Sequence, residues 1–114
     1  MTPPLSPFRR AAGLVFLSGE VPIGPGGAVP EGIEAQTELV IGKITATLAG
    51  LGLMLGDVVS VNAYLTDPGH FAAFNAVYAR QFPQPYPVRT TVTAALMLPS
   101  LLVELQVVAA DPSN

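Results

Sequence analysis

The sequence predicts an α+β fold of two layers, with two helices covering one face of a mixed sheet. Two stretches, 31–51 and 67–82, carry apolar residues at helical spacing. The segments around them have the alternating pattern or the short apolar runs typical of strands. The predicted order is two strands, helix, strand, helix and two strands. At 114 residues, the chain is expected to form a single domain over residues 1–114.

The N-terminal part predicts a strand pair and a loop. Three prolines in residues 2–7 indicate an extended lead-in, and residues 9–12 and 14–18 are expected to form two short strands that meet at Gly13. The run Gly-Pro-Gly-Gly at 24–27 is compatible only with a loop.

The first helix is predicted over residues 31–51. One apolar stripe supports it, made by Ile33, Thr37, Val40, Ile41, Ile44, Leu48 and Leu51. Gly50 and Gly52 supply a helix stop. Gly42 lies inside the helix, where glycine costs about 1 kcal/mol relative to alanine. We therefore expect a close packing contact at Gly42.

The second half predicts a strand, a helix and two closing strands. Residues 57–66 alternate between apolar and polar side chains, and Asp67 followed by Pro68 is typical of a helix start. An aromatic stripe extends the second helix to about residue 82, through Phe71, Phe74, Tyr78 and Phe82. Residues 88–94 and 101–109 are the last two strands.

The composition restricts the possible functions. Half of the residues are hydrophobic and 11% are charged, which predicts subunit interfaces that bury apolar surface. The apolar stretch 94–110 is interrupted by polar residues, so no membrane segment is expected, and the N-terminus does not resemble a signal peptide. Without cysteine there is no thiolate chemistry. Because no export signal is recognised, we expect a cytoplasmic protein. A net charge of −3 disfavours nucleic acid as a partner.

Arg89 and Glu104 stand out because each is a lone charge within an apolar strand. If the two closing strands are adjacent, these side chains can meet across the sheet. One interpretation is a structural salt bridge, since a partly buried charge is costly unless it is paired. The other is a site, in which the guanidinium binds a small carboxylate and Glu104 positions or deprotonates a water molecule. The pattern alone leaves both open.

Six segments, in order and with compatible spacing, resemble the Rid/YjgF family. They are Ser18–Pro22, Ile33–Thr37, Asp57–Val59 followed by Tyr64–Asp67, Phe71–Tyr78, Pro87–Val92 and Val103–Ala109. The resemblance implies a chorismate-mutase-like (YjgF-like) sandwich and a homotrimer with clefts between its subunits. It also implies hydrolysis of reactive enamines and imines, such as 2-aminoacrylate, to 2-keto acids and ammonia. No metal and no cofactor are implied.

The resemblance also assigns roles to individual residues. Arg89 matches the arginine that binds the substrate carboxylate, and Glu104 matches the acid that orients water. The remaining substrate-binding residues expected from the match are Phe8, Ser18, Gly19 and Asn75. Two positions depart from the family pattern: Phe8 replaces a tyrosine, and Glu20 replaces a glutamine. Glu20 adds a negative charge near the cleft, where it either weakens carboxylate binding or pairs with Arg9 or Arg10.

Three functions therefore remain in competition. The first is an enamine/imine deaminase. The second is a non-catalytic, small-carboxylate-binding or chaperone-like trimer, which the missing hydroxyl at Phe8 favours. The third is an endoribonuclease, against which the acidic charge balance argues.

Overall fold

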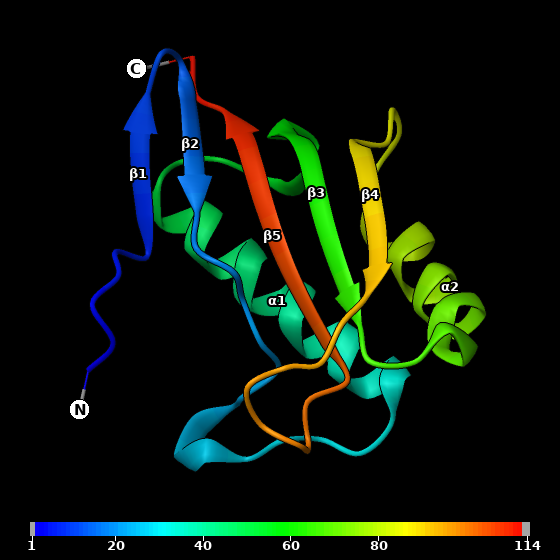
Figure 1. The fold of residues 1–114 in the computed structure, drawn as a ribbon. Helices are drawn as coiled ribbons and strands as arrows, with labels where there is room; N and C mark the ends of the chain where they lie inside the picture. The colour runs from blue at the N-terminus through cyan, green and yellow to red at the C-terminus, as the bar shows by residue number, and fades with distance from the viewer. Residues whose placement is uncertain (1, 113–114) are drawn as a thin grey trace.

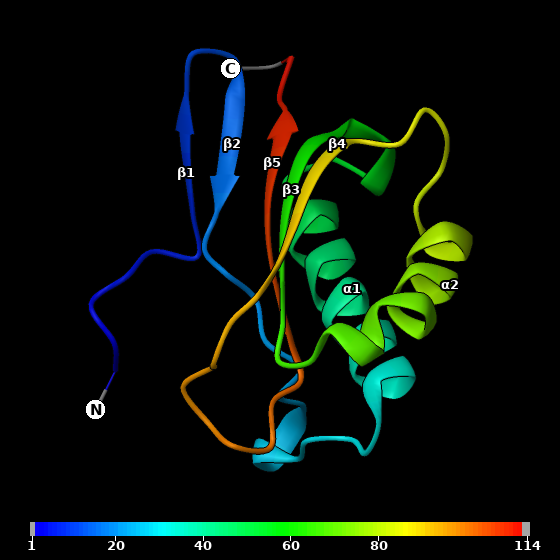
Figure 2. The ribbon, with the colours of Figure 1, turned by 45° about the vertical axis from the view of Figure 1, so that its right-hand side comes forward.

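The computed structural model describes residues 2–112 and shows one five-stranded sheet with two helices on the same face (Figures 1 and 2). The elements are β1 (Phe8–Ala11), β2 (Leu14–Leu17), α1 (Ile33–Gly50), β3 (Val58–Leu65), α2 (Phe71–Gln81), β4 (Val88–Thr93) and β5 (Val103–Ala110). Short 3-10 turns precede α1, β3 and α2. The predicted α+β sandwich is confirmed, with element boundaries close to those expected.

The strand order is β1-β2-β5-β3-β4, and it corrects one expectation. β3 and β4 are parallel, whereas all other neighbours are antiparallel. Parallel neighbours need a crossover connection, and α2 provides it between β3 and β4. β4 therefore occupies one edge, and β5 returns to pair with the other side of β3 (Figure 1). The last two strands are not adjacent, because β3 lies between them.

The hydrophobic core fills the space between the sheet and the two helices. α1 contributes the predicted stripe, with Val40, Ile41, Ile44 and Leu48 almost completely buried. On β5, alternate residues from Val103 to Ala109 face this core. The expected close contact at Gly42 is wrong. Gly42 is exposed, and a Cβ built there meets no atom within 4 Å.

The opposite face of the sheet carries no helix in the described part of the chain (Figure 2). Apolar side chains are left on this face: Val88 is 73% exposed, Val92 44% and Phe16 42%. Strand register places Val108 between Phe16 and Ser60, with Val88 beyond Ser60. The apolar composition is consistent with this arrangement, because the sheet carries apolar side chains on both faces and the helices of the chain cover only one of them.

Candidate functional site

Arg89 projects from the edge strand β4 toward the helix layer. It stands opposite Val61 of β3, which is fully buried, so both side chains point to the helix side of the sheet. There its Nη2 donates a hydrogen bond to Oδ1 of Asn75 on α2, at 2.7 Å. Because one amide oxygen uses one guanidinium N–H, Arg89 keeps other donors for a ligand.

Aromatic rings of α2 surround the Arg89 guanidinium. Its Cζ lies 4.7 Å from the ring centre of Tyr78, 5.3 Å from Phe74 and 5.9 Å from Phe71. Ring faces attract a cation at these distances, and they restrict the arginine to one orientation. Burial raises the pKa of Tyr78, and the charge of Arg89 opposes that rise without cancelling it. The aromatic stripe predicted for the second helix thus also holds the arginine.

A pocket of about 290 Å³ opens beside this arginine. Asn75 and Arg89 contribute polar groups to it, and Tyr78, Ala79, Tyr86 and Pro87 contribute mainly apolar surface. An arginine held by neighbours at the wall of an apolar pocket is suited to binding a small organic anion.

Glu104 lies on the other face of the sheet. Its neighbours Val103 and Leu105 are buried in the core, so Glu104 points away from the helices and stands opposite Tyr64 of β3. A Cβ built on Gly19 would lie 2.2 Å from Oε2 of Glu104, so the carboxylate rests against the Gly19 backbone. Burial, and then the negative charge of Glu20, raise the pKa of Glu104.

Arg89 and Glu104 therefore do not meet within one chain. They lie on opposite faces, on strands separated by β3, and none of the ion pairs in the described residues joins them. The expectation of contact across adjacent strands, and with it the structural salt bridge, is wrong. The reason is the parallel crossover through α2, which places β4 at the edge of the sheet. β3 pairs with β4 on one side and with β5 on the other, so β4 and β5 are not neighbours.

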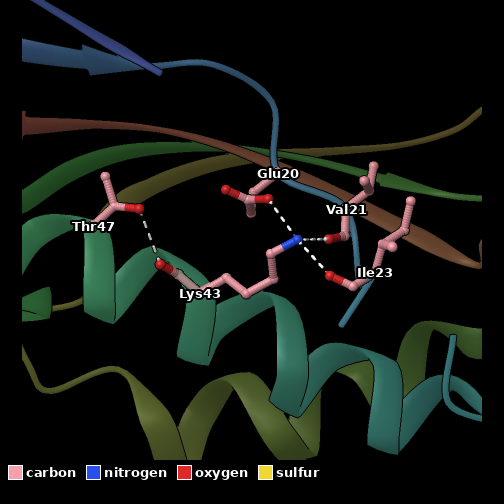
Figure 3. A network of polar contacts seen from close by, with 5 residues as sticks. All are labelled: Glu20, Val21, Ile23, Lys43 and Thr47. Atoms are coloured by element: carbon pink, nitrogen blue, oxygen red, sulfur yellow. Dashed lines mark hydrogen bonds and ion pairs between the residues drawn. The ribbon is translucent and has the colours of Figure 1, made fainter. Parts of the chain in front are cut away.

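Glu20 is paired, but with a partner that the sequence did not suggest. Its Oε1 lies 3.0 Å from Nζ of Lys43 on α1. The same ammonium donates to the carbonyl oxygens of Val21 at 2.9 Å and Ile23 at 2.8 Å (Figure 3). Arg10 instead binds Asp111, at 2.8 Å. Of the two alternatives stated for Glu20, the pairing with Arg9 or Arg10 is not found in the structure.

Phe8 and Ser18 form part of a second pocket of about 320 Å³, together with Ser6, Arg9, Phe16, Leu17 and Gln106. The Ser18 hydroxyl donates to the carbonyl of Ser6, which fixes the lead-in beside β2. The predicted residues thus fall into two groups. Arg89 and Asn75 lie at the β4 edge, whereas Phe8, Ser18, Gly19 and Glu104 lie around β2 and β5.

Residues 2–112 contain no cluster of three or more His, Asp or Glu side chains that would hold a metal ion. No helix in that range is long and apolar enough to cross a membrane.

Sequence reasoning missed Lys43, although it is the only lysine and lies on the first predicted helix. A lone lysine on a helix beside an apolar stripe was the available signal.

The family model described as endoribonuclease L-PSP matches residues 2–111. The chain belongs to this family. Among relatives, it is 41% identical over 91 residues to the mitochondrial protein mmf2 of Schizosaccharomyces pombe, which covers 80% of this chain and 72% of mmf2. It is 30% identical over 100 residues to Escherichia coli TdcF, proposed to be a reactive intermediate deaminase, which covers 84% of this chain and 78% of TdcF.

Solved structures of the endoribonuclease L-PSP family share the fold. RidA of an Antarctic Psychrobacter species superposes with a TM-score of 0.89 at 31% identity, covering 96% of this chain and 90% of RidA. E. coli TdcF with bound serine gives 0.86 at 27% identity, with the same coverage of both chains. The resemblance to the Rid/YjgF family is confirmed, and at least one related fold accommodates a small amino acid.

Proposed function

We propose that this protein hydrolyses reactive enamines and imines of the 2-aminoacrylate type to 2-keto acids and ammonia. The observation that carries the proposal is the Arg89 site. A guanidinium held by Asn75 and three aromatic rings lies at a pocket wall, with donors left over for a carboxylate. TdcF, a relative proposed to be a reactive intermediate deaminase, has been solved with bound serine, which carries a carboxylate.

The arrangement of the two residue groups supports a site shared between subunits. Arg89 and Asn75 lie at one edge of the sheet, and Glu104 and Gly19 lie toward the other side, on the uncovered face. A second copy whose β4 edge packs against that face would bring its Arg89 toward the Glu104 of the first subunit. We therefore include in the proposal a homotrimer with clefts between its subunits, in which apolar residues such as Val88 become buried.

The proposed chemistry needs only proton transfers and water. Arg89 binds the substrate carboxylate and fixes the neighbouring imine carbon. Glu104, as a carboxylate, accepts a proton from a water molecule as the water oxygen bonds to that carbon. The same proton is returned to the nitrogen, which gives a carbinolamine. The proton of its hydroxyl group then passes to the nitrogen as the carbon–nitrogen bond breaks, so that the keto group forms and ammonia leaves. The products are one 2-keto acid and one ammonia for each water consumed.

Phe8 favours the second candidate, a non-catalytic carboxylate-binding or chaperone-like trimer. Phe8 packs against the core and offers no hydroxyl to water or to a substrate amine. Binding of a keto acid such as 2-ketobutyrate without turnover, measured by calorimetry, would support this candidate.

The family description also includes ribonuclease activity, but the net charge of −3 gives little support for an RNA site. The cytoplasmic location stays a prediction.

A coupled assay tests the deaminase. Added to a serine or threonine dehydratase, the protein should accelerate the release of keto acid, because it hydrolyses the imine that the dehydratase sets free. Arg89→Ala should reduce kcat/KM by about tenfold to a hundredfold, the worth of a charged hydrogen bond. Arg80→Ala removes a surface arginine of α2 that pairs with Glu38, and it is the matched control. Unchanged release with the wild-type protein would contradict the proposal for that substrate.

A further inference from the structure

Two of the five basic side chains, Arg89 and Arg9, have no carboxylate partner among residues 2–112. The other three form the ion pairs Arg10–Asp111, Lys43–Glu20 and Arg80–Glu38. The chain has eight carboxylate side chains, so partners are not scarce. A guanidinium that is left unpaired in such a chain is available to an external anion. Arg89 already serves the proposed site, which leaves Arg9 to be explained.

Strand alternation separates Arg9 from its neighbour Arg10. Arg9 stands opposite Phe16 of β2, and Arg10 stands opposite Val15. Val15 is fully buried in the core, whereas Phe16 is 42% exposed on the face without helices. Directly opposed residues point to the same side of a sheet, so Arg9 belongs to the uncovered face. Glu104 lies on this face too.

A pocket connects Arg9 with the surroundings of Glu104. It is the pocket of about 320 Å³ described above, in which Arg9, Ser18 and Gln106 supply polar groups and no carboxylate takes part. Gln106 follows Glu104 by two residues on the same face of β5, which is about 7 Å along the strand. Ser18 precedes Gly19, on which the Glu104 carboxylate rests. The pocket therefore begins beside Glu104 and has an unpaired guanidinium at its wall.

We propose that Arg9 binds a second carboxylate of the substrate, and that the preferred substrates are imines of amino dicarboxylic acids, such as 2-iminoglutarate. This inference rests on the proposed function and on the cleft between subunits that it includes. In that cleft, Arg89 of one subunit holds the carboxylate next to the imine carbon, and Glu104 of the other faces this carbon. A substrate side chain that extends past Glu104 enters the pocket of Arg9.

The two pockets suit the two ends of such a substrate. The pocket at Arg89 is walled mainly by apolar surface, and the one at Arg9 has an amide and hydroxyl groups beside the guanidinium. A charged hydrogen bond at a partly exposed site is worth about tenfold in affinity. The reaction itself is unchanged, because 2-iminoglutarate and one water give 2-oxoglutarate and one ammonia. Arg9 stays protonated throughout and exchanges no proton.

The test compares the imines of glutamate and norvaline, which have equally long carbon chains but differ in the second carboxylate. Amino-acid oxidases generate both imines in the presence of catalase, and semicarbazide traps the imine that is not hydrolysed. The ratio of kcat/KM for the glutamate imine to that for the norvaline imine should fall about tenfold in Arg9→Gln. Arg9→Lys, which keeps the charge, should restore most of the ratio. Arg80→Gln removes an arginine from an exposed ion pair and should keep the wild-type ratio.

Product binding provides a readout that does not depend on turnover. In calorimetry, 2-oxoglutarate should bind the wild-type protein about tenfold more tightly than 2-oxopentanoate, and Arg9→Gln should abolish this preference. A preference that is the same in wild type and Arg9→Gln, in either measurement, overturns the inference even if both imines are hydrolysed. A wild-type protein that hydrolyses no imine but binds 2-oxoglutarate with an Arg9-dependent preference defeats the proposed function and supports the second carboxylate site.

Discussion

Individual side chains in this protein act through fixed neighbours. Arg89 is oriented by an amide and three rings, and Glu104 is oriented by a glycine backbone. A binding site gains from such restraint, since an ordered side chain loses less freedom when the ligand arrives. Gly19 illustrates the point, because the Glu104 carboxylate occupies the space where any other residue would have its Cβ.

Gly19→Ala should therefore damage function more than stability. The new methyl group would lie 2.2 Å from Oε2 of Glu104, so the flexible carboxylate end has to swing away while the backbone stays. We expect a folded protein with kcat/KM lowered at least as much as by Glu104→Gln. Circular dichroism and the coupled assay check this. Gly56→Ala, whose Cβ would meet only Pro83 at 3.7 Å, is the control. Full activity in Gly19→Ala would contradict the placement of Glu104.

At the level of elements, local patterns predicted the helices and strands well, but not the strand order. The stripe from Val40 to Leu48 and the alternation of β3 are properties of each segment alone. The place of β5 depends on which side of β3 is left free after the α2 crossover, and no pattern within residues 101–109 encodes this. For the same reason the sequence identified Arg89 and Glu104 as unusual but wrongly predicted their contact.

The same change, glycine to alanine, should have opposite effects on the stability of the fold at Gly42, inside helix α1, and at Gly52, just after it. Gly42 is exposed inside the helix with free space at its Cβ position, so Gly42→Ala should stabilise the fold by about 0.5–1 kcal/mol. Gly52 ends the helix at φ +76°, where alanine is strained, so Gly52→Ala should destabilise it by about 1 kcal/mol. Urea denaturation measures both. Destabilisation by Gly42→Ala would indicate that the outer face of α1 is packed against another surface.

For the whole molecule, the main feature is a sheet covered on only one face. The helices bury one face, and the other presents valines and a phenylalanine among polar groups. Composition had predicted hidden apolar surface, yet it could not tell which face would need a cover. The proposed assembly would cover this face. It would also bring together Arg89 of one subunit and Glu104 of the next, which are far apart within one chain.

Val88→Glu tests this face directly. Val88 is 73% exposed in the chain, so a carboxylate there should not disturb the fold of a single subunit. Within an interface it would be buried without a partner, which costs several kcal/mol and should separate the subunits. Sedimentation velocity is the measurement, with Ala46→Glu on the exposed side of α1 as the control. An assembly of wild-type size in Val88→Glu would exclude this part of the face from the interface.

The most direct test of a shared site is complementation between two impaired variants. Arg89→Ala and Glu104→Ala subunits are unfolded together, mixed in equal amounts and refolded, and imine hydrolysis is measured. If each site takes Arg89 from one subunit and Glu104 from the next, about one quarter of the sites in a randomly mixed ring regain both residues. We therefore predict that about a quarter of the wild-type activity returns. Activity no higher than that of the separate variants, in a mixture shown by mass spectrometry to contain mixed assemblies, would contradict a site shared between subunits.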